Sequence, residues 1–514
     1  MPAPGGENGE VTTDQAYAYM DAVDRSSERV VTGALERRSW QGREFRYAIV
    51  GHSDRLGERS LDRISDAAQM LRDPRTPRER ARSIARRFPA ILWIASNVHG
   101  GEESGTDASL RVLYELADRD DCAARQILDN AIVVLLPIQN PDGRELDTRR
   151  NAYGFDMNRD WFARTQPETD AKIELYRKLP GPLFVDDHEM GSETFFFPPN
   201  ADPIYHEITD ESIDWINDVY GASLAAEFNR QGIPFFNRSI YDLFYMGYGD
   251  TVPSTGFIAA GMTYEKHSGD PIEKRAYEQY VAPWVTLSEG AIRKREILEA
   301  WASAWREAFA QGEAGLLEPN EIVNPGNEVV TEVPDRRVRH YFITERRDSK
   351  QAEVQAMIRR LQRMVVDVYR LRKGLYVSDF TPHGRRTGAA RAGRWLAPGT
   401  WWVPMAQMQK HWVQAMLNED TYTPFPYFYD VTAWSQPLLF NVRGGYSGER
   451  LRVRAQKVGL LREPAPERLP RRLPRIALWQ LPRPRARRSS RRDGCATCSS
   501  APGSSPTRTL RPPM

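Results

Sequence analysis

The chain has 514 residues, with 40% hydrophobic and 27% charged residues, which is the composition of an ordinary globular protein. Its apolar stretches are too short to cross a bilayer, and three cysteines cannot build a disulfide framework. These features exclude a membrane-spanning protein and a disulfide-stapled scaffold. Because the length exceeds that of one average core, we expect two domains.

The net charge of +2 conceals an acidic body and a basic tail. Residues 1–450 carry a formal charge of −11, whereas the residues from Leu451 onward carry +13. The tail is rich in Arg, Pro and Ser, which predicts disorder rather than a packed core. It also contains the pair Cys495 and Cys498, which we interpret as incidental because no second pair accompanies it. We expect a solvated extension and no nucleic-acid partner.

The N-terminal residues 1–7 lack the basic and apolar regions of a signal peptide. As written, the sequence therefore predicts a cytoplasmic protein, unless its true start is missing.

In chain order, the first two thirds alternate between helical and strand patterns. A helix capped by Thr13 is expected first, followed by strands and helices in turn. Expected strands cover residues 45–50, 91–98, 131–136, 182–185 and 261–264, and expected helices cover 61–71, 106–116, 167–179 and 210–230. This alternation predicts an α/β fold with a mostly parallel mixed sheet flanked by helices.

Three of the expected strands end in groups that bind metal or protons. His99 and Glu102 follow the strand at 91–98, His188 follows 182–185, and Glu265 follows 261–264. Gly100 and Gly101 would allow a tight turn that brings Glu102 beside His99. Two His and one Glu are the three protein ligands of a catalytic zinc site, which leaves a position for water. Glu265 would then act as general base toward that water.

Two motifs lie between these strands. Residues 140–143, Asn-Pro-Asp-Gly, are a turn signature directly after the strand at 131–136. In the following stretch, Arg159 has the planar fork that suits a carboxylate, and the Asn158 amide adds a directional donor. Asp156 could hold a metal-bound imidazole in its correct tautomer.

In these residues the sequence resembles the zinc carboxypeptidase family, the funnelin-type metallocarboxypeptidases, and in particular a divergent branch of large bacterial members. The resemblance rests on five motifs in order over residues 40–270: H-x-x-E at His99, N-P-D-G at Asn140, D-x-N-R at Asp156, the strand-borne His188, and T-Y-E ending at Glu265. It implies a zinc-dependent hydrolase, a metalloprotease that acts on peptide or protein C-termini. Relatives of this kind are often secreted.

The resemblance also implies a role for each matching residue. His99, Glu102 and His188 resemble the ligands of one zinc ion, and Glu265 resembles the general base. Further roles concern the substrate: Asn158 and Arg159 would grip its terminal carboxylate, Arg149 (or Arg150) would stabilise the oxyanion, and Tyr245 (or Tyr248) would cap it.

The other histidines, His52, His206, His340, His383 and His411, are expected at the surface or in caps, and Cys122 is expected in the core. His267 could line the cleft, and the other residues of this group carry no predicted chemistry.

The C-terminal third predicts a second, smaller α/β domain. Residues 315–333 have the composition of a linker, and a strand, a helix and another strand follow over residues 339–369. We therefore divide the chain into a catalytic domain at 1–315, an accessory domain at 316–450 that is incomplete, and a disordered tail at 451–514.

Three functions are compatible with these residues. The first is a zinc metallocarboxypeptidase that removes C-terminal residues from peptides. The second is a zinc amidase or deacylase that acts on acylated amino acids with the same machinery. The third is a non-catalytic zinc-containing peptide-binding protein, which is disfavoured because Glu265 is present.

Overall fold

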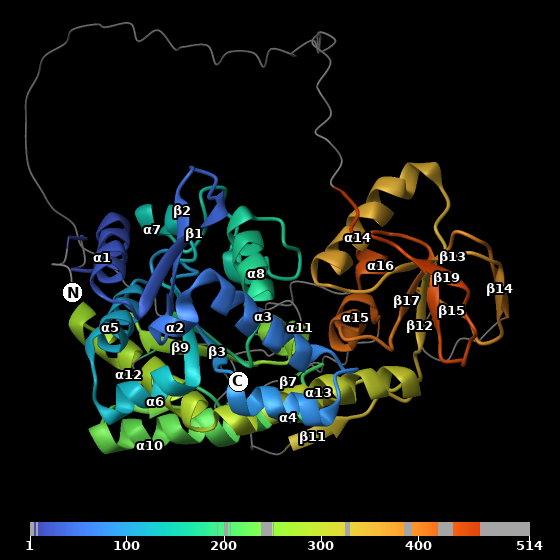
Figure 1. The fold of residues 1–514 in the computed structure, drawn as a ribbon. Coiled ribbons are helices and arrows are strands. Elements are labelled where there is room, and N and C mark those ends of the chain that lie inside the picture. The colour runs from blue at the N-terminus through green and yellow to red at the C-terminus, as the bar shows by residue number, and fades with distance from the viewer. Residues whose placement is uncertain are drawn as a thin grey trace, which may run out of the picture. The chain divides into compact units, whose positions relative to one another are not determined.

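The computed structural model describes residues 5–6, 9–192, 194–199, 204–205, 207–237, 249, 251–323, 329–384, 393–419 and 435–462. The residues up to Arg462 belong to one compact unit, shown in Figure 1. Among the described helices, none is long and apolar enough to cross a membrane.

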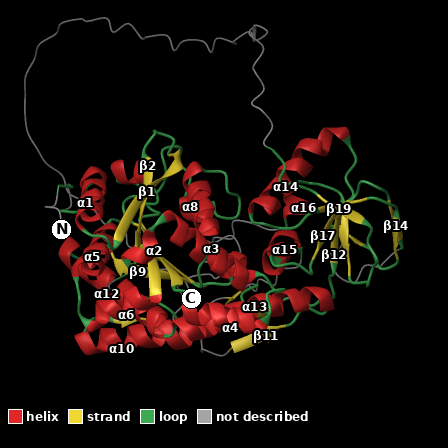
Figure 2. Ribbon diagram, viewed as in Figure 1, coloured by secondary structure: helices red, strands yellow, loops and turns green. Residues whose placement is uncertain are grey.

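An eight-stranded mixed sheet forms the core of residues 1–315, with helices on both sides (Figure 2). Its strands, in spatial order, are β1 (Val30–Arg38), β2 (Glu44–Val50), β4 (Ala131–Leu136), β3 (Ala90–Ser96), β5 (Leu183–Met190), β9 (Ala260–His267), β6 (Phe195–Phe196) and β8 (Phe235–Phe236). The four central strands are parallel, and antiparallel strands flank them. The predicted fold class is therefore confirmed.

The central strands are buried on both faces because their sequences are continuous apolar runs. On one side pack α1 (Thr13–Ser26), α5 (Ser104–Asp118), α6 (Cys122–Asn130), α10 (Ala222–Gln231) and α12 (Ile272–Ile292). A second group of packed helices comprises α3 (Glu58–Arg72), α4 (Arg78–Arg87) and α13 (Lys294–Ala314). The remaining helices are α2 (Ser53–Leu56), α7 (Pro141–Glu145), α8 (Pro167–Lys178), α9 (Asp210–Asp214) and α11 (Thr251–Phe257).

The local predictions differ from the structure at a few points. Thr12, not Thr13, caps α1, because its hydroxyl and the Gln15 side chain complete a reciprocal capping box. The expected helix at 210–230 contains a π-helical stretch, Trp215–Gly221, before it ends at Gly232 in the left-handed conformation. Cys122 is exposed at the start of α6 rather than in the core.

The second sheet is six-stranded and antiparallel throughout. Its order is β15 (Thr381–Pro382), β18 (Gly444–Ser447), β12 (His340–Ile343), β17 (Trp401–Pro404), β13 (Tyr369–Leu371) and β19 (Ala455–Lys457). The helix α14 (Gln351–Arg363) connects β12 to β13 as expected, but β17 lies between these two strands. Strand β19 falls within the range that the sequence predicted as a disordered tail, because its backbone pairs with β13.

Smaller elements complete the described chain. They are β7 (Ile204–Tyr205), which pairs with β10 (Asn320–Val323) and through it with β11 (Val329–Glu332), the ribbon β14 (Leu375–Val377) with β16 (Arg394–Leu396), and the helices α15 (Lys410–Leu417) and α16 (Gln436–Leu439). The linker expected at 315–333 therefore contributes strands to a small sheet.

A buried polar cluster lies where α15 meets the end of α13. His411 Nε2 is 2.6 Å from Glu318 Oε2, and Lys410 Nζ donates to Gln311 Oε1 at 2.7 Å. Lys410 is fully buried and His411 is 2% exposed. The expectation that His411 is a surface or capping residue is therefore wrong, because its imidazole is held in the interior by a carboxylate.

Candidate metal centre

The carboxyl ends of the parallel strands bring three metal-competent side chains together. His99 and Glu102 follow β3, and His188 lies near the end of the adjacent strand β5. One potential ligand atom from each residue lies within 4.8 Å of the others. This convergence at the edge of a parallel sheet is where ligands of α/β proteins are expected.

The individual distances show which atoms face the common point. His99 Nδ1 is 2.7 Å from Glu102 Oε1, His188 Nδ1 is 2.9 Å from Glu102 Oε2, and the two Nδ1 atoms are 3.2 Å apart. The His99 side chain is 3% exposed and the His188 side chain is 2% exposed. Two imidazole nitrogens and a carboxylate in this arrangement match the donor set of a zinc site with three protein ligands. The residues present therefore fit a zinc ion.

The outer nitrogens of both imidazoles face carboxylates. His99 Nε2 is 3.1 Å from Asp156 Oδ1, and His188 Nε2 is 3.5 Å from Asp186 Oδ2. Burial raises the pKa of Asp156, but the hydrogen bond and charge of His99 together with the charges of Arg149 and Arg159 outweigh burial, so the pKa lies below its usual range. The pKa of Glu102 is also below its usual value. Burial raises this pKa, and the charges and hydrogen bonds of His99 and His188 together lower it further than burial raises it. These carboxylates are therefore ionised at neutral pH.

The loop between β3 and α5 is shaped by its own polar groups. Asn97 adopts a left-handed backbone conformation (φ 57°), and its side-chain amide donates to the carbonyl oxygens of His99, Gly100 and Glu102 at 2.9 to 3.0 Å. A Cβ on Gly100 would lie 2.0 Å from the carbonyl carbon of Gly143. Glycine is therefore required there by the close approach of two backbones, and not by the backbone freedom that the sequence suggested.

The Asn-Pro-Asp-Gly turn contains Gly143, whose backbone lies close to that of Gly100. Asn140 caps the short helix α7 by accepting from Gly143 N at 3.0 Å. Asp142 is fully buried and accepts hydrogen bonds from Ser39 Oγ at 2.7 Å and from the Arg43 guanidinium at 2.8 Å. The turn therefore ties the β1–β2 hairpin to the edge of the sheet that carries the candidate metal centre.

Glu265 lies beside His188 in the register of the sheet. The two residues are paired across the parallel strands β5 and β9, so their side chains leave the sheet on the same face. Glu265 is 8% exposed. Strand β9 continues through Glu265 to His267. Glu265 lies next to the predicted ligand His188 because the two strands pair in this register.

Arg149, rather than Arg150, reaches the centre. Arg149 Nε donates to Asp156 Oδ2 at 2.9 Å, and its Nη1 lies 3.1 Å from His99 Nδ1. Arg150 instead donates to the Gly154 carbonyl at 3.0 Å and is exposed. Of the two arginines that the sequence left open, Arg149 is the one in contact with predicted ligands.

Asn158 and Arg159 lie on a short 3₁₀ turn, Met157–Arg159, that Asp156 caps. The Asn158 side chain is buried, with Nδ2 3.4 Å from His188 Nε2. The positive charge of Arg159 contributes to the low pKa of Asp156. Both residues thus adjoin the centre, whereas Tyr245 and Tyr248 lie outside the described residues.

Asn97 and Asp186 were not predicted as site residues, although the sequence holds a signal for each. Asp186 stands two residues before His188, and side chains two apart on a strand share a face. Asn97 stands directly after a buried strand, and Asn is the residue after Gly that most readily adopts positive φ.

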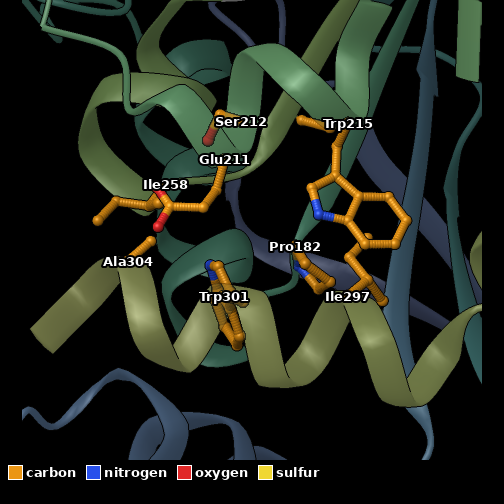
Figure 3. A pocket seen from close by; sticks show the side chains of 9 residues that line it. Pro182, Glu211, Ser212, Trp215, Ile258, Ile297, Trp301 and Ala304 are labelled. Carbon is orange, nitrogen blue, oxygen red and sulfur yellow. The ribbon is translucent and has the colours of Figure 1, made fainter. Parts of the chain in front are cut away.

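A cavity away from the centre is shown in Figure 3. Ile297, Trp301 and Ala304 contribute to it from α13, opposite Pro182 and Trp215. Its lining is mostly apolar, and none of the described residues that line it is a predicted site residue. It is a packing defect between helices and the sheet.

Comparison with known proteins identifies the class of the domain. Residues 16–229 match the family model described as "Zinc carboxypeptidase". The match includes His99, Glu102 and His188, and it ends before Glu265. Residues 16–229 are therefore identified as a zinc carboxypeptidase domain.

Particular relatives share part of this chain. A carboxypeptidase 2 from Trichophyton tonsurans is 25% identical over 214 residues, which is 41% of this chain and 35% of that protein. A probable carboxypeptidase 2 from Trichophyton verrucosum is 26% identical over 39% of this chain and 33% of that protein. The chain thus spans about a third of the length of these relatives. A metallo-carboxypeptidase structure from Pseudomonas aeruginosa is 18% identical, with a TM-score of 0.43 over 55% of this chain and 69% of that one.

Proposed function

We propose that the protein is a zinc-dependent metallocarboxypeptidase that hydrolyses C-terminal residues from peptides. The single observation that carries the proposal is the convergence of His99 Nδ1, His188 Nδ1 and the Glu102 carboxylate within 4.8 Å, inside a domain of the zinc carboxypeptidase family. A zinc ion held by these groups supplies Lewis-acid chemistry, because it makes water nucleophilic at neutral pH and polarises a carbonyl.

Glu265 is the proposed general base. Its support is its place beside His188 on the same face of the sheet and its low exposure. The carboxylate takes a proton from the attacking water and delivers that proton to the leaving amine as the peptide bond breaks.

The substrate is held by three further groups in this proposal. Arg149 contacts His99 and Asp156, so its half-exposed guanidinium is placed to stabilise the oxyanion that develops on the scissile carbonyl. Asn158 and Arg159 follow directly after Asp156 and would bind the terminal carboxylate of the peptide, Arg159 by its fork and Asn158 by its amide. Tyr245, or Tyr248, remains the proposed capping residue.

The remaining predictions accompany this one. We propose a single zinc ion, and peptide or protein C-termini as the substrates. We also retain the division into a catalytic domain at 1–315, an accessory domain after it and a basic tail.

The test combines bound metal with a matched substrate panel. Zinc content is measured on the full chain, and hydrolysis is measured for peptides with a free C-terminus, their C-terminal amides, and N-acyl amino acids. Stoichiometric zinc with cleavage of the free-acid peptides alone is the expected result. Turnover of N-acyl amino acids alone would favour a deacylase, zinc without turnover would favour a peptide-binding protein, and absence of zinc binding would refute the proposal.

A further inference from the structure

A line of buried polar side chains leads away from His188, on the side opposite the metal-facing nitrogen. It consists of Lys172 on α8, Gln139 after β4, and Asp186 on β5. All three are at most 3% exposed. Lys172 Nζ donates to Gln139 Oε1 at 2.5 Å, Gln139 Nε2 donates to Asp186 Oδ1 at 2.6 Å, and Asp186 Oδ2 lies 3.5 Å from His188 Nε2.

The line has a fixed direction because an ammonium group can only donate. Lys172 therefore requires the oxygen of the Gln139 amide, and this turns the amide nitrogen toward Asp186. Asp186 Oδ1 accepts from this amide nitrogen. Donors and acceptors thus alternate along the line and leave one acceptor, Asp186 Oδ2, facing the imidazole.

That acceptor is otherwise unused. Asp186 is fully buried, and its Oδ2 accepts no hydrogen bond from the described residues. A buried carboxylate oxygen is costly unless a donor reaches it, and His188 Nε2 is 3.5 Å away, just beyond a good hydrogen bond. The Asn158 amide nitrogen lies 3.4 Å from the same Nε2 but is itself a donor, so it cannot accept that proton.

We propose that Asp186, oriented by Gln139 and Lys172, is a positioning residue that keeps the proton of His188 on Nε2 and leaves the Nδ1 lone pair for the metal. This inference rests on the zinc site of the proposed function. It assigns to His188 the same kind of support that Asp156 gives to His99, whose Nε2 is 3.1 Å away.

Lys172 also offsets the charge of the carboxylate. A buried carboxylate is destabilising unless a cation or several donors compensate it. Lys172 supplies that cation, and two hydrogen bonds through Gln139 connect it to Asp186. Its Nζ also lies over the Trp161 ring, 3.8 Å from the ring centroid. Orientation and charge compensation therefore come from the same side chain.

The test is Asp186→Asn in the full chain. Because Gln139 still donates, the new amide must turn its oxygen toward Gln139 and its NH₂ toward His188. That arrangement favours the tautomer with the proton on Nδ1, where it competes with the metal. We expect about 10- to 100-fold weaker zinc binding, measured by competition with a chromophoric chelator. The absorption spectrum of the cobalt-substituted protein should change as well.

Asp187→Asn is the matched control. Asp187 lies on the same strand and is 1% exposed, but its side chain accepts from Ser96 Oγ at 2.9 Å on the opposite face. This variant also replaces a buried carboxyl group by an amide, yet it should keep the wild-type zinc affinity and cobalt spectrum. Equal losses in both variants would overturn the inference, because a general disturbance of the strand would then explain them.

A second variant keeps the inference testable if Asp186→Asn does not fold. Gln139→Leu preserves the carboxylate but removes the donor that orients it. A weaker zinc affinity in this variant supports the inference, and wild-type affinity in Gln139→Leu or in folded Asp186→Asn overturns it. Failure of the wild-type chain to bind zinc would instead refute the proposed function, so the two failures are distinguishable.

Discussion

The candidate metal centre and the buried cluster around His411 (the accessory cluster) both combine histidine with carboxylate, and among the described residues only the candidate metal centre brings three potential ligand atoms together. At the sheet edge, His99 and His188 face the Glu102 carboxylate. Where α15 meets the end of α13, His411 faces Glu318 at 2.6 Å, as closely as His99 faces Glu102 at 2.7 Å. Each cluster thus contains a histidine in close contact with a glutamate, and these two distances do not distinguish a metal centre from a structural cluster.

The difference lies in the source of positive charge. The accessory cluster contains Lys410, which is fully buried with its Nζ 3.8 Å from Glu318. At the sheet edge the neighbouring cation is Arg149, whose side chain is 47% exposed, and the imidazole nitrogens and carboxylate oxygens converge on one point. A cluster that holds its own buried cation is structural, whereas converging acceptors are suited to a cation from solution.

The largest expected effect concerns the proposed base. Glu265→Gln should lower kcat by about 10²- to 10⁴-fold, because only the proton transfer is lost, while the zinc content stays at the wild-type value. Steady-state kinetics and metal analysis of the same preparation provide the measurement. Glu273→Gln on the exposed surface of α12 is the control. Undiminished turnover in Glu265→Gln would remove that residue from the mechanism.

The comparison itself is tested by two alanine substitutions. His188→Ala should weaken zinc binding by more than about 100-fold, because it removes an inner ligand and even outer partners of ligands contribute 10- to 100-fold. His411→Ala removes an equally buried imidazole and should leave zinc affinity unchanged. Chelator competition measures both. If the two variants lost zinc equally, the distinction between the clusters would fail.

A smaller effect is expected at the proposed carboxylate anchor. Arg159→Met should reduce kcat/KM for free-acid peptides by about 10- to 150-fold, which corresponds to one charge-assisted hydrogen bond of roughly 1.5 to 3 kcal/mol. Zinc affinity should not change. Arg295→Met, which removes an exposed arginine that pairs with Glu299, is the control. Equal kcat/KM in wild type and Arg159→Met would assign the anchor to another residue.

The smallest effect is a pH dependence of stability from the accessory cluster. Burial raises the pKa of Glu318, but His411 and Lys410 outweigh it and lower the pKa from 4.5 to about 2. As the pH falls, the unfolded chain therefore binds this proton first. The stabilisation is complete above about pH 4.5 and disappears toward pH 2, with a loss of at most about 3 kcal/mol.

Urea unfolding of Glu318→Gln and of the control Glu313→Gln would measure this dependence. In Glu318→Gln the free energy of unfolding should fall less steeply between about pH 4.5 and pH 2 than in the wild type. In Glu313→Gln the wild-type dependence should remain, because Glu313 is exposed. An unchanged acid limb in Glu318→Gln would show that the cluster does not stabilise the ionised carboxylate.

The sequence predicted the catalytic sheet well because each parallel strand is a continuous apolar run that ends at a chemically distinctive residue. Strand β5 illustrates the limit, since it runs on through Asp186 and His188 and only pairing with β9 reveals which residues share a face. The second sheet was less predictable. Strand β17 lies between β12 and β13, and a pairing so distant along the chain leaves no local pattern.

The site showed the same limit. Motif spacing brought out His99, Glu102 and His188, but not the reason for Gly100, which depends on the backbone of Gly143. His411 was misplaced because burial of a histidine depends on a carboxylate 93 residues away. Contacts of this kind are set by tertiary packing, and they have no signature within a short window of sequence.

The hydrogen bonds of Asn97 have a further consequence for how the protein acquires and exchanges metal. Three carbonyl oxygens of the ligand loop are already bound by one amide side chain of the polypeptide itself. These hydrogen bonds hold the loop without any metal ligand, so the cost of ordering it on metal binding should be small. Unlike a zinc finger, which unfolds when its metal is removed, this domain should persist as a folded apoprotein that can be reloaded.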